Sequence, residues 1–373
     1  MEGWKKVLID GTDGAAFLAS VHGTLGCIEC HGGQTGENTK DDAHVGLIAD
    51  PSDGPSNKCL DCHAATHGTY ANAIHYTQAG YYALFEKRSG QKISDNAAYM
   101  AGFQTACGGC HATCGDCHIS SPKPVGGGLV KAHRVNRTPD MTLNCTACHG
   151  SRIGDEYYGS NDYAGADYHR VPLAMNCMDC HDGADMHGDG STPQSRYEAP
   201  GLAKCTDCHG PGIDAGWDNA YHTTHLSQFA CQVCHSQNYK SCNGCHAGEG
   251  ITGSSYETFK IGYNPRSDIR PEKYVVLRHV PVVEDTYAAW GLSTLPNFSS
   301  EPTWKLTTPH NIRRWTDRTT VDAGKPCLDA CHNSHNGAMD FFLRASDLSA
   351  LPVAEQQANQ ALVVPDGAPN ASW

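Results

Sequence analysis

The sequence is poor in the apolar material from which a protein core is built. Of its 373 residues only 8 are Phe and 7 are Met, and the mean hydropathy is −0.47. It has no apolar run of about 20 residues, as a membrane-spanning helix requires, and few apolar stripes of helical or strand period. Its 27 basic against 40 acidic residues give a net charge of −13, which argues against nucleic acid as a partner. Something other than side chains is therefore needed to fill the interior.

No cysteine stands alone. All 20 fall into ten pairs, and a histidine follows each pair directly. Nine pairs read CxxCH, and the tenth, CLDACH, is longer by one residue. CxxCH is the attachment signature of c-type haem, in which two cysteines form thioethers and the histidine binds the iron as proximal ligand. The predicted thioether residues are Cys27, Cys30, Cys59, Cys62, Cys107, Cys110, Cys114, Cys117, Cys145, Cys148, Cys177, Cys180, Cys205, Cys208, Cys231, Cys234, Cys242, Cys245, Cys327 and Cys331, and the proximal ligands are His31, His63, His111, His118, His149, His181, His209, His235, His246 and His332.

Two other uses of paired cysteines explain this pattern less well. A disulfide framework fits the even number but gives no reason for the histidines. Structural zinc needs two CxxC half-sites for each metal ion and no histidine at the next position. Ten histidines in these places by chance have a probability of about 10⁻¹². The sequence thus predicts ten covalently attached c-type haems.

The remaining histidines nearly match the number of second axial ligands that ten haems need. Ten proximal ligands leave twelve of the 22 histidines. His67 and His335 lie too close behind a proximal histidine to reach the opposite porphyrin face easily. The other ten are the predicted distal ligands: His22, His44, His75, His133, His169, His187, His222, His225, His279 and His310. His222 and His225 would share one face of a helix and could bind two adjacent irons.

Length and cysteine spacing suggest how the chain is organised. We expect loops and short helices wrapped around a chain of haems, with little β structure, and haems ordered broadly along the sequence. Residues 1–246 carry nine motifs, whereas residues 247–373 combine a haem-free insert (247–326) with the tenth motif (327–332). Within this second region we predict an edge strand over 274–283, which contains Pro281, and a short helix over 351–362.

The first ten residues, MEGWKKVLID, contain no hydrophobic stretch of signal-peptide length. Covalent haem attachment takes place outside the cytoplasm, so we expect an exported protein whose signal has been removed. An extracellular or cell-surface location is favoured over the periplasm.

The chain resembles the multihaem c-type cytochromes that metal-reducing bacteria and archaea use for extracellular electron transfer. The resemblance covers nearly the whole chain and rests on the motifs together with runs such as DDAHVGLIADPS, CGGCHATCGDCHIS, HTTHLSQFACQVCHSQNYKSCNGCH, KYVVLRHVPVVEDTY and TWKLTTPHNIRR. Histidines inside these runs match distal-ligand positions of the family: His44, His222, His225, His279 and His310.

The resemblance implies an electron carrier and not an enzyme. Its partners would be other redox proteins, metal oxides or electrodes, or further copies of the chain in a filament. A periplasmic or porin-associated shuttle is the main alternative. A multihaem reductase of nitrite, hydroxylamine or tetrathionate is less favoured, because many such enzymes have a CxxCK haem and this sequence has none.

Overall fold

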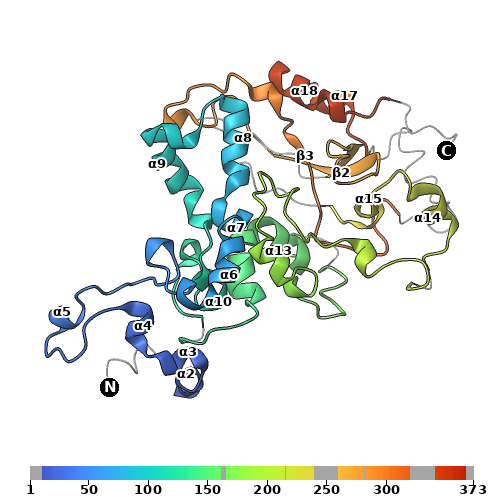
Figure 1. Cartoon of the computed structure of the whole chain (residues 1–373). Coiled ribbons are helices and arrows are strands. Elements are labelled where there is room, and N and C mark those ends of the chain that lie inside the picture. The colour runs from blue at the N-terminus through green and yellow to red at the C-terminus, as the bar shows by residue number, and fades with distance from the viewer. Residues whose placement is uncertain are drawn as a thin grey trace. The chain divides into compact units, whose positions relative to one another are not determined.

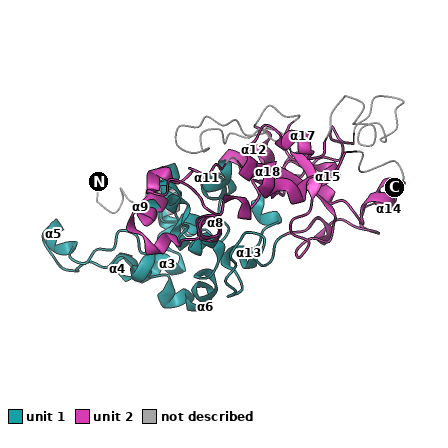
Figure 2. Cartoon of the chain, turned by 90° about the horizontal axis from the view of Figure 1, so that it is seen from above, with its two compact units in different colours: residues 1–80, 104–150, 177–202 teal, residues 81–103, 151–176, 203–373 magenta. Residues whose placement is uncertain are grey.

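The structure, a computed structural model, describes residues 11–130, 132–160, 165–214, 216–238, 259–280, 282–319 and 341–366. The chain divides into two compact units that alternate along the sequence (Figure 2). Unit 1 comprises residues 1–80, 104–150 and 177–202, and unit 2 comprises residues 81–103, 151–176 and 203–373. The first six motifs belong to unit 1 and the last four to unit 2.

Unit 1 is made of short helices joined by loops (Figure 1). Its longest helix, α6, has 11 residues and a kink at His63, where φ is −111° and ψ is 34°. The helices are α2 (Gly11–Leu18), α3 (Val21–Leu25), α4 (Cys27–His31), α5 (Lys40–Ala43), η1 (Gly54–Ser56), α6 (Leu60–Tyr70), α7 (Ile74–Thr77), η3 (Gly108–Cys110), α10 (Cys114–His118), η4 (Lys123–Val125), the π-helix η5 (Met141–Cys145), α11 (Thr146–His149), η7 (Cys177–Asp179) and α13 (Gly183–His187).

Several of these helices are the CxxCH motifs themselves. Helices α4 and α10 begin at the first cysteine of a motif and end at its histidine. One helical turn brings residues i, i+3 and i+4 to the same side of the backbone. These are the two cysteines and the histidine of the motif, which must lie on one side to form two thioethers and an axial ligand. In α10 the turn is fixed by a capping box, in which Thr113 accepts from the Asp116 backbone and Asp116 accepts from the Thr113 backbone.

Unit 2 has a three-stranded antiparallel sheet in the order β1 (Lys260–Tyr263), β2 (Tyr274–His279), β3 (Trp304–Leu306). In the middle strand, Val275 and Leu277 are fully buried. The prediction of a strand here is confirmed, but its placement at an edge is wrong because β2 pairs on both sides. The strand ends at His279, before Pro281, so the proline does not interrupt the ladder.

The remaining helices lie wholly or mostly in unit 2. The other elements are α8 (Ala79–Ser89), η2 (Ile93–Asp95), α9 (Ala97–Ala106), η6 (Gly150–Gly154, a π-helix), α12 (Asp155–Tyr158), η8 (Cys205–Asp207), α14 (Ala220–His225), α15 (Cys231–His235), η10 (Ala288–Trp290), η11 (Phe298–Ser300), α17 (Ala345–Leu348), α18 (Val353–Asn359) and η13 (Gln360–Leu362). The helix predicted over 351–362 is therefore confirmed as α18 followed by η13.

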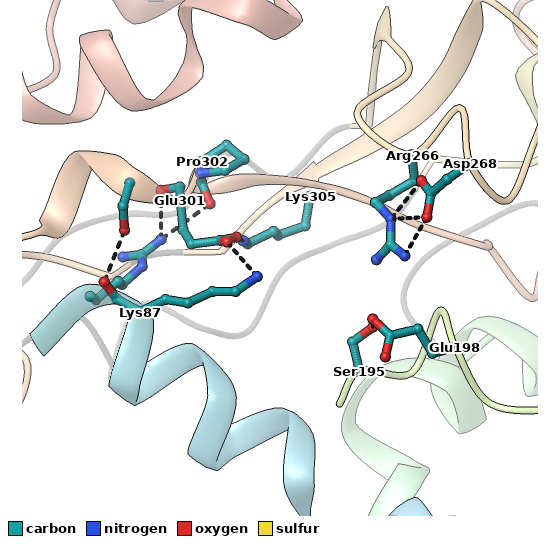
Figure 3. Close-up of polar contacts among 10 residues, drawn as sticks. Lys87, Ser195, Glu198, Arg266, Asp268, Glu301, Pro302 and Lys305 are labelled. Carbon is teal, nitrogen blue, oxygen red and sulfur yellow. Dashed lines mark hydrogen bonds and ion pairs between the residues drawn. The ribbon is translucent and has the colours of Figure 1, made fainter. Parts of the chain in front are cut away.

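Aromatic and charged contacts tie α8 to the loops of unit 2. The ring of Phe85 lies 5.0 Å from that of Tyr287 and 6.0 Å from that of Trp290, centroid to centroid. Figure 3 shows the carboxylate of Glu301 between two lysines, with Lys87 Nζ at 3.0 Å and Lys305 Nζ at 2.9 Å. These contacts fix the loop that leads into β3.

Buried hydrophobic side chains are distributed very unevenly. The described residues include 27 of them, of which only Tyr70, Ala73 and Ala132 belong to unit 1. The described fold is thus mixed helical with one small sheet, and its conventional core lies in unit 2. No helix in the described segments has the length and apolarity to cross a membrane.

Candidate metal centres formed by paired histidine rings

Eight of the ten motifs lie in the described segments. Their sixteen cysteines are all free thiols, so the disulfide alternative gains no support. The described segments also contain no cluster of three or more His, Cys, Asp or Glu side chains that could hold a metal ion, so the zinc alternative gains none either. The ninth and tenth motifs, Cys242–Cys245–His246 and Cys327–Cys331–His332, lie outside the described residues.

Six motif histidines each face a different histidine from elsewhere in the same unit. Each facing histidine is one of the ten predicted distal ligands. The pairs, with distances between ring centroids, are His63 with His22 (6.2 Å), His31 with His133 (6.0 Å), His149 with His75 (6.3 Å), His118 with His187 (6.1 Å), His209 with His169 (5.9 Å) and His235 with His222 (6.1 Å). The sequence alone could not say which of these histidines lies opposite which motif, and the structure shows six such ring pairs.

The separation of the rings fits an iron atom between two imidazoles. A metal–nitrogen bond to histidine is about 2 Å long, so two such bonds in line place the facing nitrogens about 4 Å apart. Each ring centroid lies about 1.1 Å beyond its nitrogen, which gives a centroid separation of about 6 Å. The six observed values run from 5.9 to 6.3 Å. The six pairs therefore have the separation that two imidazoles bound to one iron atom would have.

Hydrogen bonds at Nδ1 leave Nε2 as the metal-binding atom in six of these twelve rings. His31 Nδ1 lies 2.9 Å from the carbonyl oxygen of Ile48, and His118 Nδ1 lies 2.6 Å from that of Asn136. Further Nδ1 contacts are those of His235 with the Arg313 carbonyl (3.2 Å), His222 with the Trp217 carbonyl (2.8 Å), His209 with Asp214 (2.9 Å) and His169 with Asp167 (2.9 Å). An acceptor at Nδ1 fixes the proton there and orients the lone pair of Nε2, as metal-binding histidines require.

Burial keeps several of these imidazoles neutral, which is the form that binds metal. Burial lowers the pKa of His75 and of His133. Burial together with the neighbouring His118 and His75 lowers the pKa of His187. His169 differs because its hydrogen bond to Asp167 raises its pKa. A lowered pKa favours the neutral form of these three imidazoles.

The other four predicted distal ligands are placed in different ways. His44 caps α5 and is exposed, on a loop that extends away from α6 and α10 of unit 1 (Figure 1). His225 shares α14 with His222, as predicted, and its Nδ1 contacts the Tyr221 carbonyl. His310 Nδ1 contacts the Thr308 carbonyl. His279 is buried, with Nε2 2.8 Å from Glu355 Oε1, so a carboxylate occupies the side of the ring that would bind iron.

Contacts between thiols show which motifs are neighbours. A hydrogen bond with Cys114 raises the pKa of Cys59, and the same bond lowers the pKa of Cys114 to about 6. Corresponding pairs are Cys145 with Cys177 and Cys205 with Cys231, and Cys110 bonds Cys148. The second motif thus adjoins the fourth, and the third adjoins the fifth. Motifs five and six, and motifs seven and eight, are neighbours in the sequence as well as in space.

Residues that orient the histidines were not predicted from the sequence. Asp185 lies four residues after His181 and accepts its Nδ1–H, and this bond raises the pKa of His181. Asp214 lies five residues after His209. An acidic residue within five positions of a motif histidine is a signal that could have identified both. The carbonyl acceptors carry no such signal, because every residue has one.

Comparisons of the chain with protein-family models, with curated proteins and with solved structures gave no match.

Proposed function

We propose that this chain is an electron carrier that holds c-type haems through its ten Cys–His motifs and coordinates most of them with two histidines. The observation that carries the proposal is the set of six ring pairs at 5.9–6.3 Å, each joining a motif histidine to a histidine from a distant segment. Two imidazoles are an incomplete ligand set for iron, and a porphyrin would supply the four equatorial nitrogens. When bound, these groups would supply reversible one-electron oxidation and reduction.

The chain's own part in this function is positional. It holds an imidazole on each side of an iron position and fixes six of the twelve rings with an acceptor at Nδ1, such as Ile48 for His31. It also places the attachment cysteines of different motifs in contact, as at Cys59 and Cys114. Covalent groups attached at such neighbouring cysteines would lie side by side, which favours electron exchange between them. Imidazoles on both sides leave a substrate no coordination position, which favours electron transfer over catalysis at these six pairs.

Location and partners follow from the attachment chemistry and the charge. Because c-type haem is attached outside the cytoplasm, we propose an exported protein, at the cell surface or extracellular in preference to periplasmic. The acceptors would be other redox proteins, metal oxides or electrodes, and further copies of the chain would be partners if it forms filaments. In a filament, a histidine of one subunit could complete a haem of the next. His22 gives no support for this arrangement, because it faces His63 of the same chain.

Spin state and haem count test the proposal together. The purified holoprotein should contain about ten covalent haems per chain by mass, and most of them should be low-spin in electron paramagnetic resonance (EPR) and visible spectra. Replacing His75 by alanine removes the imidazole that faces His149 and should convert about one haem per chain from low to high spin. The control, Val353→Ala, changes an exposed side chain of α18 and should leave the spectrum unaltered. A chain that matures without covalent haem would contradict the proposal.

A further inference from the structure

His111, the histidine of the third motif, is an exception among the described motif histidines. Six of the eight face a second imidazole, and His181 bonds Asp185. The ring of His111 instead lies against Tyr76, with 4.9 Å between centroids and an interplanar angle of 57°. No histidine ring of the described segments lies against it. Its Nε2 atom lies 3.4 Å from Oδ1 of the Asp53 carboxylate.

The side of His111 that would bind iron therefore faces oxygen. The distance of 3.4 Å from Nε2 to Asp53 Oδ1 is close to the span of about 4 Å that two metal–ligand bonds in line require. Imidazole suits iron well, whereas carboxylate oxygen prefers harder cations. A carboxylate at this position would be a weak sixth ligand to reduced iron, and a neutral molecule that binds iron better could displace it.

The position is also accessible. The side chains of His111 and Asp53 are partly exposed, at 30% and 38%. Tyr76 borders the position and contacts a second histidine, His67, whose ring lies 6.2 Å from that of Tyr76. His67 is one of the two histidines that the sequence left without an iron to bind.

We propose that the third motif forms a site for small exchangeable ligands, lined by Asp53 and Tyr76. Its ligands are uncharged diatomic molecules that bind reduced iron, of which carbon monoxide is the practical probe. This inference rests on the proposed function, because it needs a haem attached at Cys107 and Cys110. It goes beyond that function by giving one haem of the electron carrier a coordination position open to solvent.

Carbon monoxide titration of the reduced holoprotein tests the inference. Haem content is first confirmed by mass, so that a failure of haem attachment, which would contradict the proposed function, is recognised separately. The native protein should bind about one carbon monoxide per chain and show a high-spin ferric signal of about one haem by EPR. As a matched control, His187→Ala removes the imidazole facing His118 and should raise binding to about two per chain. Tyr76→Phe and Asp53→Asn should keep the stoichiometry and shift the C–O stretching frequency.

Two results would overturn the inference. The first is a native protein that binds no carbon monoxide while His187→Ala binds one, since the third haem would then already have a strong sixth ligand. If His67→Ala restores binding in that case, His67 is that ligand. The second is binding that appears only when the protein is diluted until oligomers dissociate, which would mean that another copy of the chain supplies the ligand.

Discussion

Unit 1 carries six of the ten attachment motifs and buries three hydrophobic side chains among its described residues, whereas unit 2 carries four motifs and buries 24 among its own. The two units therefore fill their interiors with different material. Unit 2 has a sheet whose middle strand is buried on both faces, and a folded polypeptide can be stabilised by such a core alone. Unit 1 has no equivalent among its described residues. We infer that its interior is completed by the groups bound at its motifs.

The surface of unit 1 is consistent with this difference. Near its first motif, Leu18, Val21, Leu25 and Ile28 are exposed, from 45% for Ile28 to 79% for Val21. A cluster of exposed apolar side chains on a chain of low hydropathy indicates a surface that something covers. A porphyrin attached at Cys27 and Cys30 would lie beside these side chains and remove them from water.

The largest expected effect comes from removing a haem from unit 1. Replacing Cys145 and Cys148 by alanine prevents attachment at the fifth motif, which adjoins the third and the sixth through cysteine contacts. We expect most of unit 1 to lose protection in hydrogen exchange, a loss of more than about 5 kcal/mol in the free energy of opening. Peptides from α6 and α10 report the change.

The matched control removes a haem from unit 2 by replacing Cys231 and Cys234 with alanine. Strand β2 should keep its protection, because its core consists of Val275, Val276 and Leu277 among other side chains. If either change caused an equal loss of protection in both units, the two interiors would depend on haem to the same extent. The contrast between the units would then be removed.

The second effect is confined to unit 2. Leu277→Ala deletes a fully buried side chain of β2 and should cost about 3 kcal/mol in the free energy of opening of the strand. Val353→Ala, on the 68% exposed side chain of α18, should change it by less than about 0.5 kcal/mol. Hydrogen exchange of the β2 amides gives both values. If Leu277→Ala also changed the spin state of haems in unit 1, the core of unit 2 could not be treated as independent.

The sequence predicted local features well and spatial pairing poorly. Strand β2 and helix α18 were found because β-branched runs and helical periodicity are local signals. The middle position of β2 was missed, because sheet order depends on partners such as Trp304 that are distant in the chain. The list of candidate axial histidines followed from counting, but which histidine faces which motif depends on how loops fold back. Spacing alone could not bring His133 opposite His31.

His279 provides the third prediction, because it was predicted as a distal ligand and lies in the core of unit 2. Its Nε2 contacts Glu355, which also accepts a hydrogen bond from Thr303 at 2.6 Å. Glu355→Ala leaves His279 and Thr303 buried without this acceptor. The change should lower the free energy of unfolding of unit 2 by about 2 kcal/mol. His279→Gln should leave the number of low-spin haems unchanged, in contrast to His75→Ala. A high-spin signal in His279→Gln would restore this residue as an axial ligand.

The smallest expected effect is electrostatic and depends on pH. Burial opposes ionisation of Glu301, but hydrogen bonds and charge from Lys305 and Lys87 outweigh it and hold the pKa of Glu301 below its usual value. A carboxyl whose pKa is lower in the folded state stabilises that state above its unfolded pKa of about 4.3, and this stabilisation disappears as the pH falls through the folded value. Glu301→Gln should therefore cost roughly 0.5–1 kcal/mol at neutral pH, and the difference from the native protein should vanish in acid.

Asp268→Asn is the matched control for this pH dependence, since Asp268 pairs with Arg266 on an exposed loop (Figure 3). Its hydrogen bond to Arg266 also lowers the pKa of Asp268, but water screens this pair, and the variant should match the native protein at every pH. Unfolding of unit 2 followed from neutral pH into acid compares the two variants. If Glu301→Gln were as stable as the native protein at neutral pH, α8 would be held to the loop before β3 by its other contacts, which include the hydrogen bonds from Arg88 to the carbonyl oxygens of Glu301 and Pro302.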